Sequence, residues 1–309
     1  MRNSFTLIVG LVAANMVLFA PVTRAQTQDD ASSRQIVLDR FNKARPGGEV
    51  TAGISGAGTT GSRPPVYRRT GALRPPGGRK PAVVSSEEIG VTVWRLRPSQ
   101  SGDTGGRVLV LDGLKPAEWT PERIEADTPL NIGDRVRLTV ESPRPGFLYI
   151  IDREQYADGS LGEPMLIFPT LQTRGGDNRV EPGRLIDIPA QEDQYSYFTA
   201  QPSGDRRDQV AEVLTIILVP RPLPLQIGRQ PLKMTGQQIT GWEKLWGGAA
   251  ERLELVGGAG RIWTNEEKAA GAAKGRQLTQ TGPPPQTVYR IARKKGGPLL
   301  VTVPLRYAR

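Results

Sequence analysis

The chain has 309 residues, of which 36 are glycine and 27 are proline, and this leaves little room for long helices. It contains no histidine and no cysteine, which excludes disulfides, imidazole acid–base catalysis and zinc sites built on imidazole or thiolate. The 41 basic and 31 acidic residues give a net charge of +10, which at first sight suggests an anionic partner.

Residues 1–25 have the pattern of a secretory signal peptide. Arg2 precedes an apolar run of 16 residues from Phe5 to Ala20, and Thr23 and Ala25 are small residues at the positions that define cleavage. We expect cleavage near Ala25 and a secreted or periplasmic mature chain with no transmembrane segment. In the alternative, the run stays as an uncleaved anchor, although a spanning helix needs about 20 apolar residues.

Residues 26–86 are predicted to form a disordered, basic linker. Nine glycines and six prolines stand among 61 residues, with ten basic residues against four acidic ones. Such a composition buries too little apolar surface to offset the entropy lost on ordering. Only the segment Gln35–Lys43 has helical spacing, and it predicts one short amphipathic turn.

Short β-type runs begin at Ile89. The runs Ile89–Leu96 and Arg107–Leu111, separated by a polar turn, predict a hairpin. Alternation over Asp134–Glu141 predicts a half-buried strand, with valine and leucine on one face and arginine and threonine on the other. The apolar run Phe147–Ile151 predicts a central strand that is covered on both faces.

Four more strands are predicted before Pro220: Leu166–Phe168, Leu185–Ile188, Tyr195–Thr199 and Val210–Val219. Repeated short strands with turn residues between them are typical of a β-sandwich. We therefore expect an all-β, antiparallel, sandwich-like (immunoglobulin-like) core over residues 87–220.

Residues 221–309 are predicted to add two short accessory helices and two strands that pack on this core. Thr235–Trp246 has apolar residues at helical spacing, namely Ile239, Trp242, Leu245 and Trp246. Thr264 and Glu267 have the capping-box spacing of a second helix start. The alternating runs Thr287–Ala292 and Leu299–Tyr307 predict strands that complete a sheet.

Two short motifs match known site patterns but lack the necessary context. Gly56–Gly61 fits the dinucleotide fingerprint, yet no strand and helix flank it. Asp103-Thr104-Gly105 is the aspartic-protease tripeptide, but a carboxylate dyad needs two such loops and the chain has one. We interpret the first as a chance match and the second as a polar turn.

Two other groups of residues have both a functional and a structural interpretation. Asp152, Glu154 and Asp158 with Gly159 offer oxygen ligands for calcium, but their spacing differs from the calcium-loop pattern and equally fits a solvated turn. The three tryptophans of the C-terminal third can stack on sugars or pack in the core, and helical spacing favours the core; they are Trp242, Trp246 and Trp263. We therefore assign no catalytic, cofactor-binding or metal-binding residue and expect no cofactor.

The succession of segments from Asn131 to Pro220 resembles the bacterial family catalogued as domain of unknown function 4384. The resemblance implies a β-rich accessory domain of the kind attached to kinase, caspase-like or envelope proteins, and it carries over no site residues. No catalytic domain accompanies the module here. The matching segments are Ile132-Gly133-Asp134, Pro145-Gly146-Phe147-Leu148-Tyr149, Asp158-Gly159, Leu166-Ile167-Phe168-Pro169, Asn178-Arg179-Val180-Glu181-Pro182-Gly183, Ile186-Asp187-Ile188-Pro189 and Phe198.

Taken together, the sequence predicts an exported, non-catalytic module for cell-envelope association or protein interaction. The partner would be an envelope protein or an anionic envelope polymer. The alternative is a histidine-free hydrolase that uses paired carboxylates on envelope glycans and needs them about 5 to 9.5 Å apart in one cleft.

The positive charge is unevenly distributed along the chain. Residues 87–267 carry a net charge of −7, whereas residues 26–86 carry +6 and residues 268–309 carry +9. Because the predicted β core is acidic, the high net charge is not that of a basic domain, and nucleic acid is not an expected partner.

Overall fold

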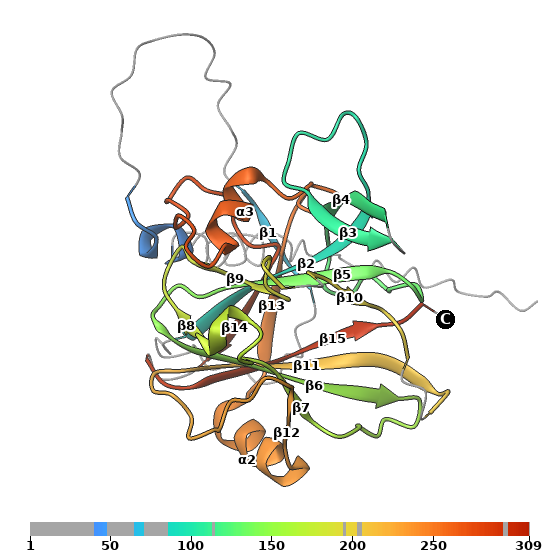
Figure 1. Cartoon of the computed structure of the whole chain (residues 1–309). Coiled ribbons are helices and arrows are strands. Elements are labelled where there is room, and N and C mark those ends of the chain that lie inside the picture. Colours follow the sequence, from blue (N-terminus) through green and yellow to red (C-terminus); the bar gives the residue numbers. More distant parts are fainter. Residues whose placement is uncertain are drawn as a thin grey trace, which may run out of the picture.

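The computed structural model describes residues 40–47, 65–70, 86–112, 115–193, 196–202, 206–292 and 296–308. They form two antiparallel β-sheets stacked face to face, which confirms the predicted all-β sandwich (Figure 1). The signal segment, the Gly56–Gly61 motif and most of the predicted linker lie outside these residues. No helix in the described ranges is long and apolar enough to cross a bilayer.

The first sheet runs through six strands, with three more attached beside β2. In spatial order the six are β1 (Tyr67–Arg69), β13 (Ala250–Leu255), β14 (Thr287–Ala292), β2 (Ser86–Pro98), β4 (Lys115–Ile124) and β3 (Val108–Asp112). Strands β14 and β4 pair with successive parts of one edge of β2. The opposite edge of β2 pairs with β5 (Arg135–Glu141), whose partners are β9 (Leu185–Ile188) and β10 (Phe198–Thr199).

The second sheet is built around two 11-residue strands that pair along their whole length. They are β6 (Gly146–Tyr156) and β11 (Gln209–Val219). Flanking them are β15 (Leu299–Arg306), β7 (Met165–Phe168), β12 (Leu232–Lys233) and β8 (Arg179–Val180). The short 3-10 turn η1 (Arg174–Gly176) precedes β8. The two C-terminal strands β14 and β15 therefore belong to different sheets.

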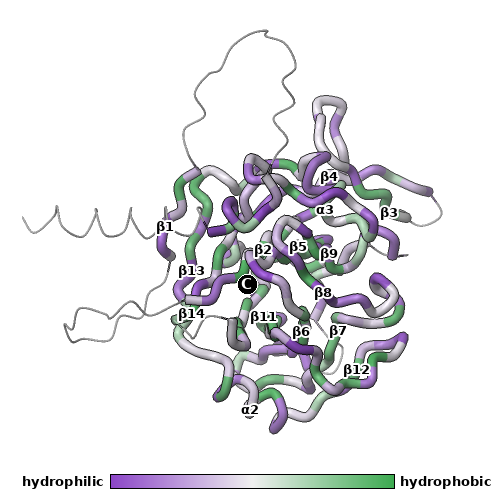
Figure 2. Tube along the Cα trace, turned by 90° about the vertical axis from the view of Figure 1, so that its left-hand side faces the viewer, coloured by the Kyte–Doolittle hydropathy of each residue, from purple (hydrophilic) through white to green (hydrophobic). Residues whose placement is uncertain are grey.

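The main core fills the space between the sheets. Alternate residues of β2 and β5, such as Val91 and Leu138, meet alternate residues of β6 and β11, such as Ile150 and Ile216. In Figure 2 green hydrophobic segments lie along β6, β7 and β11. Burial of these faces is the principal force that holds the sheets together.

The outer face of the second sheet is covered by helix α2 (Gly236–Trp246). Thr235 caps its start by accepting a hydrogen bond from the Gln238 N–H. Ile239 and the half-buried Trp242 and Trp246 pack on β6 and β11, as the helical spacing predicted. Leu245 is instead 65% exposed. Because both faces of β6 are covered, the prediction of a central strand at Phe147–Ile151 is confirmed.

The outer face of the first sheet is buried as well, which differs from the half-exposed strand expected at Asp134–Glu141. The strand itself is confirmed as β5, but Arg137 and Thr139 are buried. Helix α3 (Asn265–Gly271) and the segment that follows it lie over this face (Figure 1), and Trp263 stacks 4.5 Å from the Arg137 guanidinium. A period-2 pattern shows that the two faces differ in polarity, but it does not show what covers the polar one.

The predicted hairpin between Ile89–Leu96 and Arg107–Leu111 is wrong. Strand β3 pairs with β4, and β4 lies between β3 and β2. Strand β4 escaped detection because Pro116 and Pro121 interrupt its pattern, and proline lacks the N–H that a sheet ladder uses.

Two stretches inside the predicted linker pack against the first sheet. Residues 40–44 are helical and bury Phe41, and β1 adds Tyr67 to the same small cluster. Arg45 reaches the buried Glu141 through two 2.7 Å hydrogen bonds. These contacts connect the N-terminal part of the chain to the sandwich.

The chain makes a tight turn at Pro182-Gly183. Gly183 has a φ of +78°, and the Arg184 N–H donates to the Glu181 carbonyl, as in a type II turn. Gly146 is required for a different reason, a close approach between backbones. It lies in β6, where an added Cβ would approach the Val219 carbonyl oxygen to 2.9 Å.

Candidate functional site

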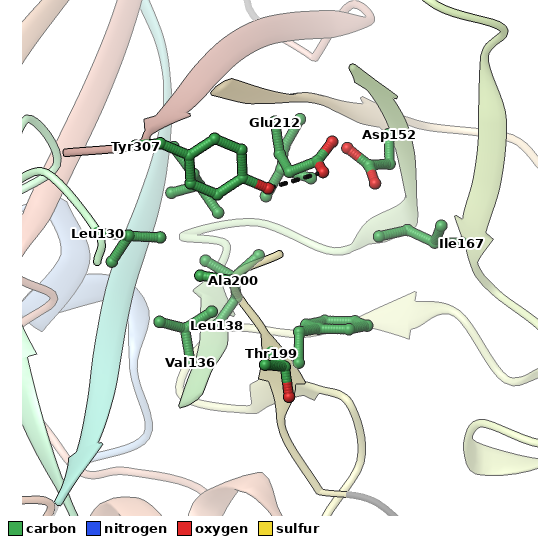
Figure 3. Close-up of a pocket in the computed structure, with 12 residues that line it drawn as sticks. Leu130, Val136, Leu138, Asp152, Ile167, Thr199, Ala200, Glu212 and Tyr307 are labelled. Carbon is green, nitrogen blue, oxygen red and sulfur yellow. Dashed lines mark hydrogen bonds between the residues drawn. The ribbon is translucent and has the colours of Figure 1, made fainter. Parts of the chain in front are cut away.

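A pocket of about 140 Å³ opens at one end of the space between the two sheets (Figure 3). Its walls are mostly aliphatic, and two carboxyl groups and one phenol face it. We call it the end pocket, and the residues that line it are Leu130, Val136, Leu138, Asp152, Ile167, Phe198, Thr199, Ala200, Glu212, Leu214, Leu305 and Tyr307.

The pocket exists because the inner faces of two central strands change from apolar to polar along their length. On β6, Ile150 belongs to the main core, and Asp152 follows it on the same face. On β11, Glu212 precedes the core residue Leu214 in the same way. Because Leu214 lies opposite Asp152 in the antiparallel register, the two carboxyl groups come close together.

The remaining walls come from distant parts of the chain. Leu130 forms a bridge with Tyr307 immediately after β15, and this brings the phenol into the pocket. The Gly133 N–H donates to the Ala200 carbonyl and holds the turn before β5 beside β10. Phe198 on β10 is 39% exposed at the rim.

Asp152 and Glu212 form a carboxyl pair in which each group affects the pKa of the other. Burial, followed by the charge of Glu212, raises the pKa of Asp152 from its usual 3.8 to about 8. Burial also raises the pKa of Glu212, although hydrogen bonds from Tyr307 and Gln209 oppose this. At neutral pH the pair therefore shares one proton and carries one negative charge, because two adjacent buried carboxylates cannot both ionise without a large cost.

The hydrogen bonds around the pair leave one acceptor without a donor. Glu212 Oε1 accepts from the Tyr307 hydroxyl at 3.0 Å and from Gln209 Nε2 at 2.7 Å. Asp152 Oδ1 is buried, and no N–H or O–H donor among the described residues reaches it. Burial and the charge of Glu212 raise the pKa of Tyr307, so the phenol stays protonated.

No cation of the described residues neutralises the carboxyl pair. Neither Asp152 nor Glu212 forms an ion pair with a residue in the described ranges, whereas each fully buried carboxylate in those ranges has an arginine within 4.0 Å. Those carboxylates are Glu87, Glu88, Glu141, Asp187, Glu254 and Glu267. Burial also raises the pKa of Glu88, Asp187 and Glu254, so the end pocket differs from these carboxylates in lacking an arginine among the described residues.

The residues weighed as a calcium site are not brought together. Asp152 and Glu154 lie on β6, and Glu154 accepts from the Tyr156 hydroxyl at 2.5 Å. Asp158 lies in the turn beyond, where it binds the Ser160 N–H and Arg206. Within the described ranges no three acidic side chains converge in a way that could hold a metal ion.

The other candidate residues have structural roles. Asp103 accepts hydrogen bonds from Arg97, the Gln100 N–H and Thr120, and this network holds its pKa below the usual range. It stabilises the polar turn before β3. Trp263 is buried against Trp94, which agrees with the core-packing interpretation.

The sequence contains a weak sign of the carboxyl pair that matches no known motif. A single glutamate interrupts the apolar run of β11 at Glu212, and an aspartate directly follows the run of β6. Only the pairing register shows that these two interruptions are neighbours.

No family model, no curated protein and no solved structure matches the chain. The resemblance to domain of unknown function 4384 stays a prediction based on the ordered segments between Asn131 and Pro220.

Proposed function

We propose that the chain is an exported, non-catalytic β-sandwich module that binds an envelope protein by taking one of its side chains into the end pocket. The observation that carries this proposal is a preformed aliphatic pocket with an exposed aromatic rim at one end of a sandwich. Concave, mostly apolar pockets with a few converging polar groups are the usual form of binding sites.

Export rests on the signal pattern of residues 1–25, and interaction rests on the pocket and its surroundings. Ile132, close to Leu130 in the chain, is 60% exposed beside the Gly133–Ala200 contact. Exposed apolar residues around a pocket favour a macromolecular partner, because a small soluble ligand would leave them in water.

The alternative function, carboxylate-dependent glycan hydrolysis, receives support from one feature and opposition from another. A carboxyl group with a pKa near 8 could donate a proton as a general acid. However, Asp152 and Glu212 are in contact, whereas the two carboxyl groups of glycosidases are about 5 to 9.5 Å apart and hold the glycosidic bond between them. The geometry therefore favours binding.

Retention of the purified mature chain on isolated cell envelopes tests the proposal. Ala200→Phe fills the pocket and is expected to reduce retention at least tenfold, while Leu109→Phe, a similar change at an exposed site on β3, leaves retention unchanged. Because Ala200→Phe can disturb folding, Phe198→Ala provides a second variant that removes only the rim aromatic. Equal retention of all four proteins would contradict the proposal.

A salt titration in the same assay separates the two classes of partner. Attachment of the basic segments to an anionic polymer weakens as salt rises, because exposed charges are screened within about 10 Å at 0.1 M salt. Binding through a partly buried pocket persists. Loss of all retention at 0.5 M salt, with no effect of the pocket variants, would favour the polymer.

A further inference from the structure

We propose that the end pocket recognises a lysine side chain of the partner protein, with the aliphatic stem against its walls and the ammonium group on Asp152 and Glu212. This inference deepens the proposed function and rests on it for the source of the lysine. The observation behind it is a carboxyl pair with no cationic partner in the described ranges, where the six fully buried carboxylates all have arginine partners.

Charge is the first argument for a cationic group. The six fully buried carboxylates named above are each paired with an arginine inside the protein, whereas Asp152 and Glu212 share a proton instead. A buried carboxylate without a counter-charge is costly, and an incoming cation removes that cost. The pocket is therefore complementary to a ligand that brings its own positive charge.

The arginines described near the pair bind other carboxylates and do not neutralise Asp152 or Glu212. Arg153, the next residue on β6, belongs to the opposite face and pairs with Glu243 of α2 at 2.5 Å. Arg206 stacks on Tyr156 and forms ion pairs with Asp158 and Asp208.

The other neighbours of the pair are acidic or neutral. Glu154 on β6 adds a further acidic group, while Gln209 and Tyr307 are neutral donors. The lining residues from β5, β7 and β10 carry no charge.

Shape and hydrogen bonding favour an ammonium group on an aliphatic stem. In general, an apolar cavity of about 150 Å³ can hold benzene, which has six heavy atoms. The end pocket, at about 140 Å³, is therefore large enough for the lysine side chain, which has about five heavy atoms beyond Cα. An ammonium group has three N–H donors, one of which can satisfy Asp152 Oδ1. A metal ion fits less well, since calcium takes six or more oxygen ligands and the aliphatic walls supply none.

Binding includes a proton transfer that can be measured. When the ammonium group arrives, Asp152 loses its proton to solvent, and the new ion pair forms between the Asp152 carboxylate and the intact ammonium group. The ligand keeps all three N–H bonds, and the released proton is taken up by buffer. Because the ammonium group also lowers the pKa of Asp152, up to one proton is released at pH 7 for each lysine bound.

Isothermal titration calorimetry on the mature chain tests the inference with two blocked tripeptides, Gly-Lys-Gly and Gly-norleucine-Gly. The lysine peptide is expected to bind at least tenfold more tightly, the usual effect of one charged hydrogen bond. Its affinity is expected to rise by up to about ninefold from pH 6 to 7 and about fivefold from pH 7 to 8, as Asp152 with a pKa of about 8 ionises. Buffers with different ionisation enthalpies should give different heats, which counts the released proton. Equal affinities for the two peptides would overturn the inference.

Variants assign the effect to the carboxyl pair. Asp152→Asn and Glu212→Gln are each expected to weaken lysine-peptide binding at least tenfold, with proton release lost in Asp152→Asn. Glu163→Gln changes an exposed carboxylate outside the pocket and leaves binding unchanged. Circular dichroism confirms that each variant is folded. Undiminished binding in both pocket variants would exclude the pair as the site.

Further titrations distinguish a lysine of a partner protein from a free amine or a metal ion as the ligand. Free n-butylammonium binding as tightly as the peptide would favour a small amine over a partner protein, and calcium ion displacing the peptide would favour a metal site. If the pocket variants lose envelope retention while neither peptide binds, the lysine inference fails and the proposed function stands. If the lysine peptide binds but the pocket variants are retained on envelopes as well as the original chain, the proposed function fails.

Discussion

The outer face of the first sheet and the end pocket both bury carboxyl groups, but they neutralise them differently. On the outer face Glu141, Asp187 and Glu267 pair with Arg45, Arg137 and Arg123. In the end pocket no cation of the described residues pairs with Asp152 or Glu212, and the hydrogen-bond donors to Glu212 are the neutral Tyr307 and Gln209. The comparison teaches that burial alone does not mark a site in this protein, because a buried charge with an internal partner is structural. A buried charge without one points to a partner from outside.

Removing an arginine from the outer face should have the largest effect. Arg45→Met leaves Glu141 buried without its two hydrogen bonds and should lower the free energy of unfolding by about 3 to 5 kcal/mol. Urea denaturation of the mature chain at pH 7 measures it. The double variant Arg45→Met, Glu141→Met should recover much of the loss, because no charge remains buried. A loss below 1 kcal/mol for the single variant would show that Arg45 does not hold the N-terminal segment on the sheet.

Removing the ionisable group from the end pocket should raise the free energy of unfolding, whereas removing Arg45 lowers it. Since the pKa of Asp152 is about 8 in the folded chain and near 3.8 when unfolded, the folded chain holds the extra proton between these values. Stability from this group is therefore present at low pH and lost as the pH rises from about 4 to 8.

Asp152→Asn removes this dependence and should stabilise the chain at pH 9 by about 1 to 3 kcal/mol, the usual cost of an uncompensated buried polar group. At pH 4 the original chain and the variant should unfold at similar temperatures. Thermal unfolding across this pH range provides the measurement. A variant less stable than the original at pH 9 would mean that the carboxylate is already neutralised.

A lysine introduced into the wall of the end pocket should pair with the carboxylate there, as the arginines do on the outer face of the first sheet. Ile167 lines the pocket beside Asp152 (Figure 3). Ile167→Lys should reduce the loss of stability between pH 5 and 9 by about 1 kcal/mol, because its ammonium group pairs with the ionised carboxylate. Denaturation at both pH values tests this, with Ile167→Met as the uncharged control. An unchanged pH dependence would contradict a cation-deficient pocket.

Removing an exposed carboxylate should change the free energy of unfolding less than a change in either region. The Glu163 side chain is 70% exposed and its ion pair with Lys233 is equally open to solvent. Glu163→Gln should change the free energy of unfolding by no more than about 0.5 kcal/mol at any pH from 5 to 9. A larger change in urea denaturation would mean that exposed pairs also contribute to stability, which would weaken the contrast with the buried ones.

Much of the fold followed from local patterns. The continuous run at Phe147–Ile151 predicted a strand that is covered on both faces, and β6 is such a strand. The capping box at Thr264 and Glu267 predicted the start of α3, because it satisfies N–H groups locally. Strand β4 was missed because its prolines break the local pattern, although its neighbours in the sheet hold it in place.

The candidate site was less accessible to sequence reasoning. Asp152 was noticed as part of a possible calcium turn with Asp158, which lies only six residues away in the chain. Its actual neighbour is Glu212, 60 residues away, and they meet because β6 and β11 pair in one particular register. A shift of one residue would turn Glu212 to the opposite face of the sheet.

The sequence by itself determined the exclusion of cysteine and histidine chemistry, the β-rich class and the acidic charge of the central region, because these depend on composition and on short-range periodicity. The tertiary structure decided which charges are paired. It buried the arginine face of β5 under α3 and placed none of the described cations beside Asp152 and Glu212. Ion pairing depends on distances between residues far apart in the chain, and only the packing of the two sheets sets those distances.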